Sequence, residues 1–249
     1  MSEAAAKEKR EAADGVAETI GVPLSVFTLP IAGRSWHVRA ARDHASLMAA
    51  ADRFVAFPFG LLLWESAQAL AEALADDKES LAGRTVLELG AGVGLPGIVA
   101  RWLGAAAVRQ TDHISEALAL CRANAEENGV GGIEVALANW DAWTDAHTYD
   151  LIIGSDVIYE RSAHAPLAAI LDHNLAPGGR VLLADPGRQD TPLFLADLTA
   201  TGWKSARRRR AVPALLPGGA ESVGVDIIEL WKMMIAERDR LPRGPRAAK

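Results

Sequence analysis

Apolar runs and amphipathic stretches alternate along the chain from residue 84 onward. The apolar runs are rich in Val, Ile and Leu, and polar residues do not alternate with them. Such runs predict strands that are buried on both faces, which is typical of a parallel sheet covered by helices. The predicted strands are 85–89, 107–112, 133–138, 149–155 and 180–185, and the predicted helices are 96–103, 115–128, 163–175 and 191–201.

The end of the chain departs from this alternation. Residues 204–212 and 225–231 are strand candidates with no helix between them, so we expect them to pair antiparallel. The whole pattern predicts an α/β fold with a mostly parallel seven-stranded sheet that ends in an antiparallel hairpin. Residues 237–249 hold five basic residues and two prolines, and we expect a disordered tail there.

The N-terminal part has a different pattern. Residues 1–18 mix alanines with charged residues and predict a frayed helix or a tail. Two short strand-like runs, 24–29 and 35–40, flank a turn of Pro30–Gly33 and predict a hairpin. A weakly amphipathic stretch over 44–54 follows.

Apolar residues at helical spacing over 63–75 predict a further helix. We therefore divide the chain into an N-terminal extension over 1–56, a single domain over 57–236 and a tail.

Composition and charge narrow the classes of protein. The 249 residues are 50% hydrophobic and 23% charged, which is typical of a globular chain. A net charge of −6 argues against a dedicated nucleic-acid surface. No apolar run reaches the ~18 residues of a membrane span, and no secretory signal opens the chain. The single cysteine, Cys121, is expected to be inert core in a reducing compartment, so we expect a cytoplasmic protein.

Four consecutive arginines, Arg207–Arg210, form the most basic segment of the predicted sheet. Alternate residues of a strand point to opposite faces, so these arginines do not make a continuous stripe for a duplex. Two interpretations stay open, namely an edge strand whose charges discourage aggregation and a contact with an acidic protein partner. The six histidines and one cysteine have no zinc-type spacing, so no metal site is expected.

The segment Val86–Gly97, with the sequence VLELGAGVGLPG, carries the most chemical information. A strand runs into a turn dense in glycine, and a helix begins near Pro96, since proline is favoured in a first helical turn. Glycines let the backbone approach a ligand closely, and the helix N-terminus adds a positive dipole end. Asp112 follows at the end of the next strand, where an acid can accept the hydroxyl groups of a ribose.

Two ligands compete for this segment. Read from Gly92 it is Gly-x-Gly-x-x-Gly, a nicotinamide fingerprint, and read from Glu88 it is Glu-x-Gly-x-Gly-x-Gly, as in S-adenosylmethionine-dependent methyltransferases. Gly92 comes three residues after Leu89, whereas the first glycine of a dinucleotide site follows its strand directly. Glu88 would repel a pyrophosphate but suits a cationic ligand with an amino group. S-adenosylmethionine is therefore the predicted cofactor, and a turn without any ligand is the third alternative.

From about Phe59 to Trp231 the chain resembles the seven-β-strand protein-lysine methyltransferases of methyltransferase family 16. The resemblance implies a single Rossmann-like class I methyltransferase domain that transfers methyl groups to a lysine of a protein. Asp156-Val-Ile-Tyr159 matches the family's Asp-x-x-Tyr signature after the fourth strand. The other matching segments are Gly60–Ala67, Glu88–Gly94, Asp112 and Asn139-Trp140.

The resemblance also implies roles for individual residues. Asp156 and Tyr159 are the expected catalytic residues, with Asp156 orienting the amine and Tyr159 walling its pocket. Both residues also have a plain alternative, as the end of a strand and the cap of a helix. The expected cofactor-binding residues are Trp64, Glu88, Gly90, Ala91, Gly92, Gly94, Asp112, Asn139, Trp140 and Ser155.

A finer resemblance lies in Asp185-Pro186-Gly187-Arg188, which is similar to the branch that methylates the β-subunit of the electron-transfer flavoprotein. That subunit is the candidate protein partner, and a monomer is the expected state. Arg188 is expected at the mouth of the site, either pairing with an acidic group of the partner or tethering its own loop. Two further functions stay open, namely a small-molecule N-methyltransferase and an inactive binding module.

Overall fold

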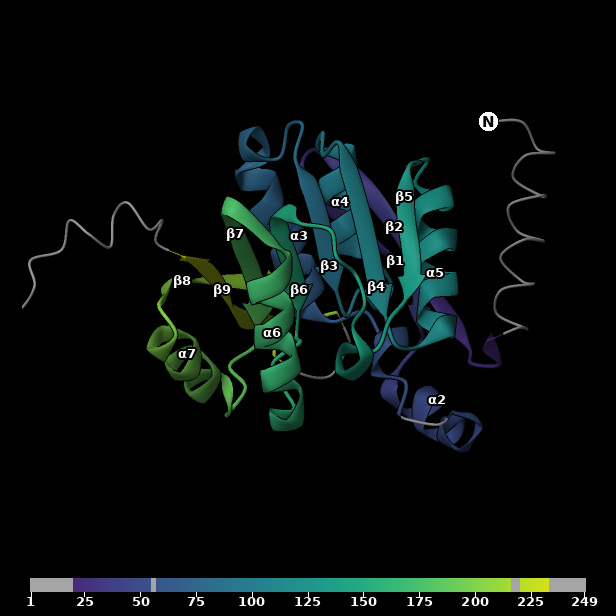
Figure 1. Cartoon of the computed structure of the whole chain (residues 1–249). Coiled ribbons are helices and arrows are strands. Elements are labelled where there is room, and N and C mark those ends of the chain that lie inside the picture. The colour runs from purple at the N-terminus through teal and green to yellow at the C-terminus, as the bar shows by residue number, and fades with distance from the viewer. Residues whose placement is uncertain (1–19, 55–56, 216–219, 233–249) are drawn as a thin grey trace, which may run out of the picture.

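The computed structural model describes residues 20–54, 57–215 and 220–232. A seven-stranded sheet forms its centre, with the strand order β5-β4-β3-β6-β7-β9-β8 (Figure 1). The predictions for residues 1–18 and 237–249 lie outside the described residues. The strands are β3 (Thr85–Leu89), β4 (Ala107–Asp112), β5 (Ile133–Leu137), β6 (Tyr149–Ser155), β7 (Leu175–Asp185), β8 (Trp203–Pro213) and β9 (Ser222–Lys232).

Strands β3 to β7 pair in parallel, while β9 runs antiparallel to both β7 and β8. The predicted α/β class and the antiparallel end of the sheet are therefore confirmed. The strand that differs most from its predicted range is β7, which begins at Leu175 and not at residue 180. The sequence Ala-Pro-Gly-Gly near its start is typical of a turn, and here it forms an irregularity within the strand, opposite Tyr149–Leu151, where Gly178 has a φ of 76°.

Helices cover both faces of the sheet. On one face α3 and α4 pack in a core with Val86, Ile153 and Ile227, and α5 lies beside α4. On the other face α6 and α7 pack against Leu87 and Ile152. The helices are α3 (Glu65–Asp76), α4 (Leu95–Trp102), α5 (Ser115–Glu127), α6 (His164–Asn174) and α7 (Thr191–Ala200). Among the described residues no helix is long and apolar enough to cross a membrane.

The predicted N-terminal hairpin is formed by β1 (Leu24–Ile31) and β2 (Arg34–Ala41). Its turn is tighter than predicted, with only Ala32 and Gly33 at φ of 54° and 74°. Two successive positive φ values characterise the hairpin turn whose twist matches that of its strands. The hairpin leads into α2 (His44–Ala49), which Asp43 caps through the Ser46 N–H.

Two asparagines one helical turn apart, Asn124 on α5 and Asn128 at its C-terminal cap, fasten this hairpin to the domain. The Asn124 side chain accepts from the N–H of Arg39 at 2.7 Å and donates to its carbonyl at 3.0 Å. Asn128 does the same for His37, at 3.0 and 2.8 Å. The two side-chain amides thus form the hydrogen bonds to the β2 backbone that a neighbouring strand would otherwise form. Asn124 also donates to the carbonyl of Val93, which ties the hairpin to the loop after β3.

The four arginines of β8 alternate between faces, and three of them form ion pairs within the chain. Arg207 and Arg209 contact the buried Asp226 at 3.5 and 3.1 Å, and Arg210 pairs with Glu72 and Asp76 on α3. Much of this charge is therefore compensated internally. The result favours the interpretation of a charged edge strand over that of a docking site for an acidic partner.

Candidate active site

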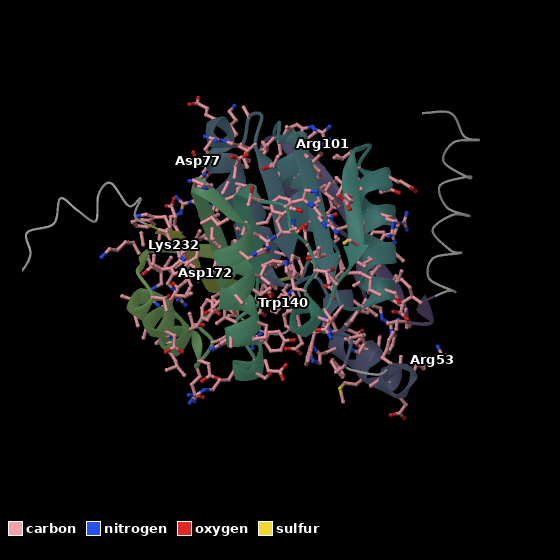
Figure 2. The ribbon with its side chains drawn as sticks, viewed as in Figure 1. Arg53, Asp77, Arg101, Trp140, Asp172 and Lys232 are labelled. Atoms are coloured by element: carbon pink, nitrogen blue, oxygen red, sulfur yellow. The ribbon has the colours of Figure 1, made fainter. Side chains whose placement is uncertain are left out.

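A cavity of ≈ 690 Å³ opens beyond the carboxyl ends of β3, β4 and β6. The strand order changes direction between β3 and β6, and ligands of open α/β sheets bind at such a switch point. Trp140, which lines the cavity, lies near the lower edge of the sheet in Figure 2, whereas Asp77 and Arg101 lie toward the upper edge. The cavity volume falls within the range of small-molecule sites.

Ten of the twelve site residues predicted from the sequence line this cavity, although they come from five separate segments. They are Trp64, Gly90, Ala91, Gly92, Asp112, Asn139, Trp140, Ser155, Asp156 and Tyr159. Glu88 and Gly94 are the two that do not. The parallel topology explains the convergence, because successive strands end at the same edge of the sheet.

The loop after β3 is folded tightly around glycine conformations. Gly92 and Gly94 have φ of 54° and 86°, a region that residues with a Cβ seldom adopt. A Cβ at Gly92 would lie 3.1 Å from the Gly60 carbonyl oxygen, and one at Gly94 would lie 2.9 Å from Cys121 Sγ. Gly94 therefore shapes the loop and begins α4, without reaching the cavity.

Asp112 holds the same loop from the end of β4. Its Oδ2 accepts from the Gly92 N–H at 2.9 Å, and its Oδ1 accepts from the Ile114 N–H at 3.0 Å. The carboxyl group is 4% exposed, and burial raises its pKa. Since a carboxylate accepts about four hydrogen bonds, lone pairs remain for hydroxyl groups in the cavity.

Glu88 differs from the sequence expectation of a direct contact with the cofactor. It is fully buried, and Oε2 accepts from the Gly97 N–H at 3.0 Å and from Gln110 Nε2 at 2.7 Å. Gln110 also donates to the Gly94 carbonyl at 2.7 Å, so this pair braces the glycine loop from behind. Burial raises the pKa of Glu88 to about 8. The sequence could not separate the two roles, since both place an acid before the glycines.

Asp156 lies at the end of β6 in an unusual backbone conformation, with φ of 55°, and its N–H donates to the Ala184 carbonyl at 2.7 Å. Its carboxylate forms a bidentate ion pair with Arg188, with Nε to Oδ1 at 2.8 Å and Nη2 to Oδ2 at 2.5 Å. This pair favours the alternative that Arg188 acts as a tether within its own chain. Arg188 pairs with an acid of its own chain.

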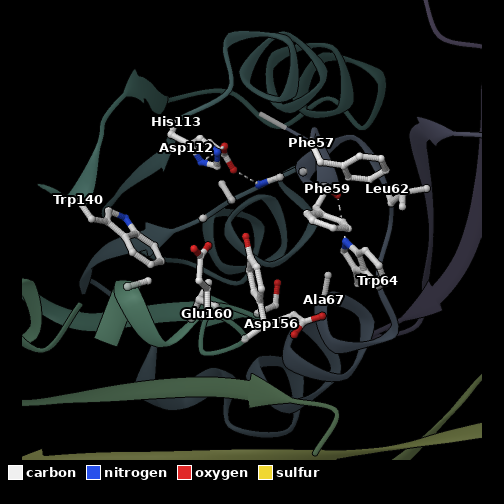
Figure 3. Close-up of a pocket in the computed structure, with 18 of the residues that line it drawn as sticks. Phe57, Phe59, Leu62, Trp64, Ala67, Asp112, His113, Trp140, Asp156 and Glu160 are labelled. Carbon is white, nitrogen blue, oxygen red and sulfur yellow. Dashed lines mark hydrogen bonds and ion pairs between the residues drawn. The ribbon is translucent and has the colours of Figure 1, made fainter. Parts of the chain in front are cut away.

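Aromatic rings line the side of the cavity next to Asp156 (Figure 3). Phe59 is central, with ring centroids 4.4 Å from Phe57, 6.0 Å from Tyr159 and 6.3 Å from Trp64. The Trp64 indole donates to the Phe59 carbonyl, which fixes this group. Sequence reasoning missed Phe57 and Phe59, although the segment Phe-Pro-Phe-Gly, with its two aromatic residues before a predicted helix, was the available signal.

The charges around the cavity are mostly negative. Its lining includes the carboxyl groups of Asp112, Asp141, Asp156 and Glu160, together with one arginine, Arg188. In Figure 3 Glu160 and Asp112 lie on opposite sides of the cavity. A lining of this kind favours cationic ligands and disfavours phosphates.

The sheet order and the placement of the cavity define a Rossmann-like fold of the kind found in methyltransferases. The 16S rRNA methyltransferase RsmC of T. thermophilus, solved with AdoMet and guanosine, superposes with a TM-score of 0.57 at 17% identity, covering 84% of this chain and 51% of that one. Magnesium protoporphyrin IX methyltransferase of Synechocystis, solved with SAM, gives 0.54 at 17% identity, covering 68% and 79%. At this identity the likeness shows the fold.

Residues 45–198 match the family described as lysine methyltransferase, and the chain belongs to this family. The zebrafish (Danio rerio) protein N-lysine methyltransferase METTL21A is 38% identical over 129 residues, which cover 49% of this chain and 58% of that protein. The Danio rerio electron transfer flavoprotein beta subunit lysine methyltransferase is 33% identical, covering 53% and 51%. Histone-arginine methyltransferase METTL23 of Xenopus laevis is 32% identical, covering 49% and 54%. The chain spans about half the length of these curated relatives.

Proposed function

We propose that this protein is an S-adenosylmethionine-dependent protein-lysine N-methyltransferase. The observation that carries the proposal is one cavity in which a ribose-type acid, Asp112, and a glycine loop lie together with Asp156 and Tyr159. A nicotinamide cofactor is disfavoured, because the carboxyl groups of the lining would repel its phosphates.

Three features of the cavity fit S-adenosylmethionine. The glycine loop lines the cavity with its backbone, and it can pack this closely against Gly60 because Gly92 has no Cβ, which would lie 3.1 Å from the Gly60 carbonyl oxygen. Asp112 keeps acceptor sites for the two ribose hydroxyls, and Trp140 offers a ring face at the adenine end. We assign Gly90, Ala91, Gly92, Asn139, Ser155 and Trp64 to the remaining contacts with the cofactor.

The acceptor is an amine, and the protein must present it without its proton. A free lysine has a pKa of ~10.4, and burial in an apolar pocket lowers that value, so the proton leaves to solvent before transfer. Phe59 and Tyr159 supply the apolar wall, and Asp156 accepts a hydrogen bond from the neutral amine. When bound, S-adenosylmethionine supplies a methyl group whose bond to sulfur breaks as the nitrogen lone pair forms the new N–C bond. Holding the reactants in line contributes ~7–11 kcal/mol.

The finer proposal concerns the acceptor protein, which we take to be the electron-transfer flavoprotein β-subunit. The Asp185–Arg188 segment and the relative named for that activity support it. We place the reaction in the cytoplasm, where a single free cysteine such as Cys121 is ordinary. The relative named as a histone-arginine methyltransferase makes an arginine acceptor the second candidate.

The test combines the purified enzyme with radiolabelled S-adenosylmethionine and either purified electron-transfer flavoprotein or a cell extract. We expect label on the β-subunit, and peptide masses that place each addition on a lysine. Asp156→Ala is the matched inactive control. Label on another protein's lysine rejects this acceptor and keeps the enzyme class. Additions at arginine, or label confined to small molecules, reject lysine methylation.

A further inference from the structure

The ion pair between Asp156 and Arg188 places a fixed positive charge beside the acid that meets the acceptor. We infer that Arg188 is a positioning residue that keeps the acceptor amine neutral, by offsetting the charge of Asp156 while leaving it able to accept a hydrogen bond. This inference rests on the proposed function, since it concerns the amine end of the same cavity.

The chain holds Arg188 in this place through the turn that precedes it. Asp185 Oδ1 accepts from the N–H groups of Gly187 and Arg188, at 2.8 and 2.9 Å, and Thr191 donates to its other oxygen at 2.9 Å. Asp185 is itself fully buried. The turn aims Arg188 toward Asp156, whose left-handed backbone conformation presents its carboxylate to the same point. The pair is thus built by two separate loops of the sheet edge.

Electrostatics explains why an arginine is needed there. The Asp156 side chain is 6% exposed, so its charge is weakly screened by water. Alone, such a carboxylate would stabilise an adjacent ammonium and raise the pKa of the acceptor, which would hold it in the unreactive form. The guanidinium opposes that effect, since a like charge nearby disfavours a protonated amine. Two oxygens with about four lone-pair sites still leave room for an N–H donor.

Other ionisable groups face this point from the neighbouring elements. Asp185 lies behind Arg188, and Tyr159 and Glu160 follow Asp156 on its own loop. Asp112 and His113 come from the end of β4, Asp141 follows β5, and His44 comes from α2. All of these groups remain in a variant of Arg188. A difference in proton binding between that variant and the unmodified protein therefore reports the arginine.

The experiment measures the protonation of an amine held at this position. The probe is an S-adenosylmethionine analogue in which nitrogen replaces sulfur and a primary aminoethyl chain replaces the methyl group. Calorimetry in two buffers of different ionisation enthalpy gives the protons released on binding. The proteins compared are the unmodified enzyme, Arg188→Gln, Arg188→Lys and the control Arg180→Gln. Arg180 also joins two acids, Asp77 and Glu229, but Asp77 lies toward the other edge of the sheet.

At pH 7.5 we expect the unmodified enzyme, Arg188→Lys and Arg180→Gln to release close to one proton from the primary amine. Arg188→Gln should release much less, since the pKa of the amine rises by roughly one to three units. In methyl-transfer assays of Arg188→Gln, the acid limb of the curve of kcat against pH should move to higher pH by a similar amount. If Arg188→Gln does not fold, proton release by the unmodified enzyme and by Arg188→Lys carries the test.

The outcomes separate this inference from the proposed function. Equal proton release by the unmodified enzyme and Arg188→Gln, or no release by the unmodified enzyme, overturns the role of Arg188. Binding of S-adenosylhomocysteine without binding of the amine probe rejects the amine site itself. Failure to bind either ligand rejects the proposed cofactor.

Discussion

At the scale of single residues, two buried carboxyl groups on neighbouring strands have opposite tasks. Asp112 lines the cavity and has lone pairs free to accept hydrogen bonds there. Glu88 instead accepts hydrogen bonds from Gly97 and Gln110 inside the protein. Both pKa values are raised, and burial is the first cause in each case. A raised pKa alone therefore does not identify the ligand-binding residue here. The position of each carboxyl group relative to the cavity distinguishes them.

Asp112→Ala should weaken binding of S-adenosylhomocysteine by about tenfold or more. Each hydrogen bond to a charged group contributes ~1.5–3 kcal/mol, and a factor of ten corresponds to ~1.4 kcal/mol. The substitution also frees the Gly92 N–H, which loosens the loop. Calorimetric titration measures the dissociation constant. Asp112→Asn keeps one acceptor oxygen, so its dissociation constant should lie between those of the unmodified protein and Asp112→Ala. Unchanged affinity in both variants would remove Asp112 from the cofactor site.

Glu88→Gln should alter how stability depends on pH. The pKa is about 8 in the folded protein and about 4.5 in the unfolded chain. Between these values the folded state binds more protons, so its stability falls as pH rises, by up to ~1.4 kcal/mol per pH unit. The variant lacks this loss, so it should gain stability relative to the unmodified protein between pH 5 and pH 8.

Urea unfolding of both proteins at several pH values measures this difference. Glu126→Gln is the matched control, because Glu126 is exposed on α5. Parallel curves for Glu88→Gln and the unmodified protein would show that Glu88 is ionised when buried.

At the scale of elements, the sequence predicted the five parallel strands of the central sheet because an apolar run without alternation has few other structures available. It predicted the two antiparallel strands because no helical pattern separates residues 204–212 from 225–231. It also predicted the positions of Asp112, Asp156 and Trp140, since each lies at or shortly after the end of a strand that stops at the ligand edge. It failed where a local pattern competes with a tertiary contact. The Ala-Pro-Gly-Gly start of β7 reads as a turn, yet Leu175 pairs with Tyr149 of β6.

The pairing of Arg188 with Asp156 was missed for a similar reason. Nothing in the spacing of 32 residues shows that two loops meet, and only the parallel order of β6 and β7 brings them together. Phe57 and Phe59 were missed because they lie before α3, far along the chain from Tyr159 in the loop after β6, and only the fold brings Phe59 next to that ring.

Asn124→Ala tests how α5 holds the N-terminal hairpin. It leaves the N–H and carbonyl of Arg39 and the carbonyl of Val93 without this partner, so we expect a loss of ~1–3 kcal/mol in unfolding free energy. Hydrogen exchange should accelerate in β2 and in the loop after β3 more than in β6. Glu126→Ala on the same helix is the control. Uniform acceleration over the whole sheet would mean that the hairpin has no separate anchor.

At the scale of the whole molecule, the cavity is assembled from the segment between α2 and α3 and from the carboxyl edge of the sheet. The segment around α2 supplies Phe57 and Phe59, and the loops after β3 to β7 supply the polar groups. The family match begins at residue 45, just before the first of these aromatic residues and after the hairpin. The hairpin lies outside the residues that the family model matches, and it contacts the glycine loop through Asn124.

We expect the negative lining to make methyl transfer to a protein acceptor sensitive to salt. A protein acceptor brings a cationic lysine to a mouth that carries Glu160 and Asp141, both exposed, so encounter is favoured electrostatically and is screened by salt over ~10 Å at 0.1 M. We expect kcat/KM for the protein acceptor to fall as NaCl rises. Glu160→Gln should lower it at low salt by about 1.4- to fivefold, as an exposed charge pair contributes ~0.2–1 kcal/mol, and should flatten the salt dependence.

The matched control for this prediction is Glu134→Gln. Glu134 is an exposed acid on β5 that pairs with Arg109 and does not line the cavity. The Glu134→Gln substitution removes the same charge from the molecule as Glu160→Gln, so an effect of net charge alone would appear equally in both variants. If Glu160→Gln changes the salt dependence of kcat/KM and Glu134→Gln does not, the attraction lies at the mouth of the cavity. Equal changes in the two variants would assign it to the overall charge of −6.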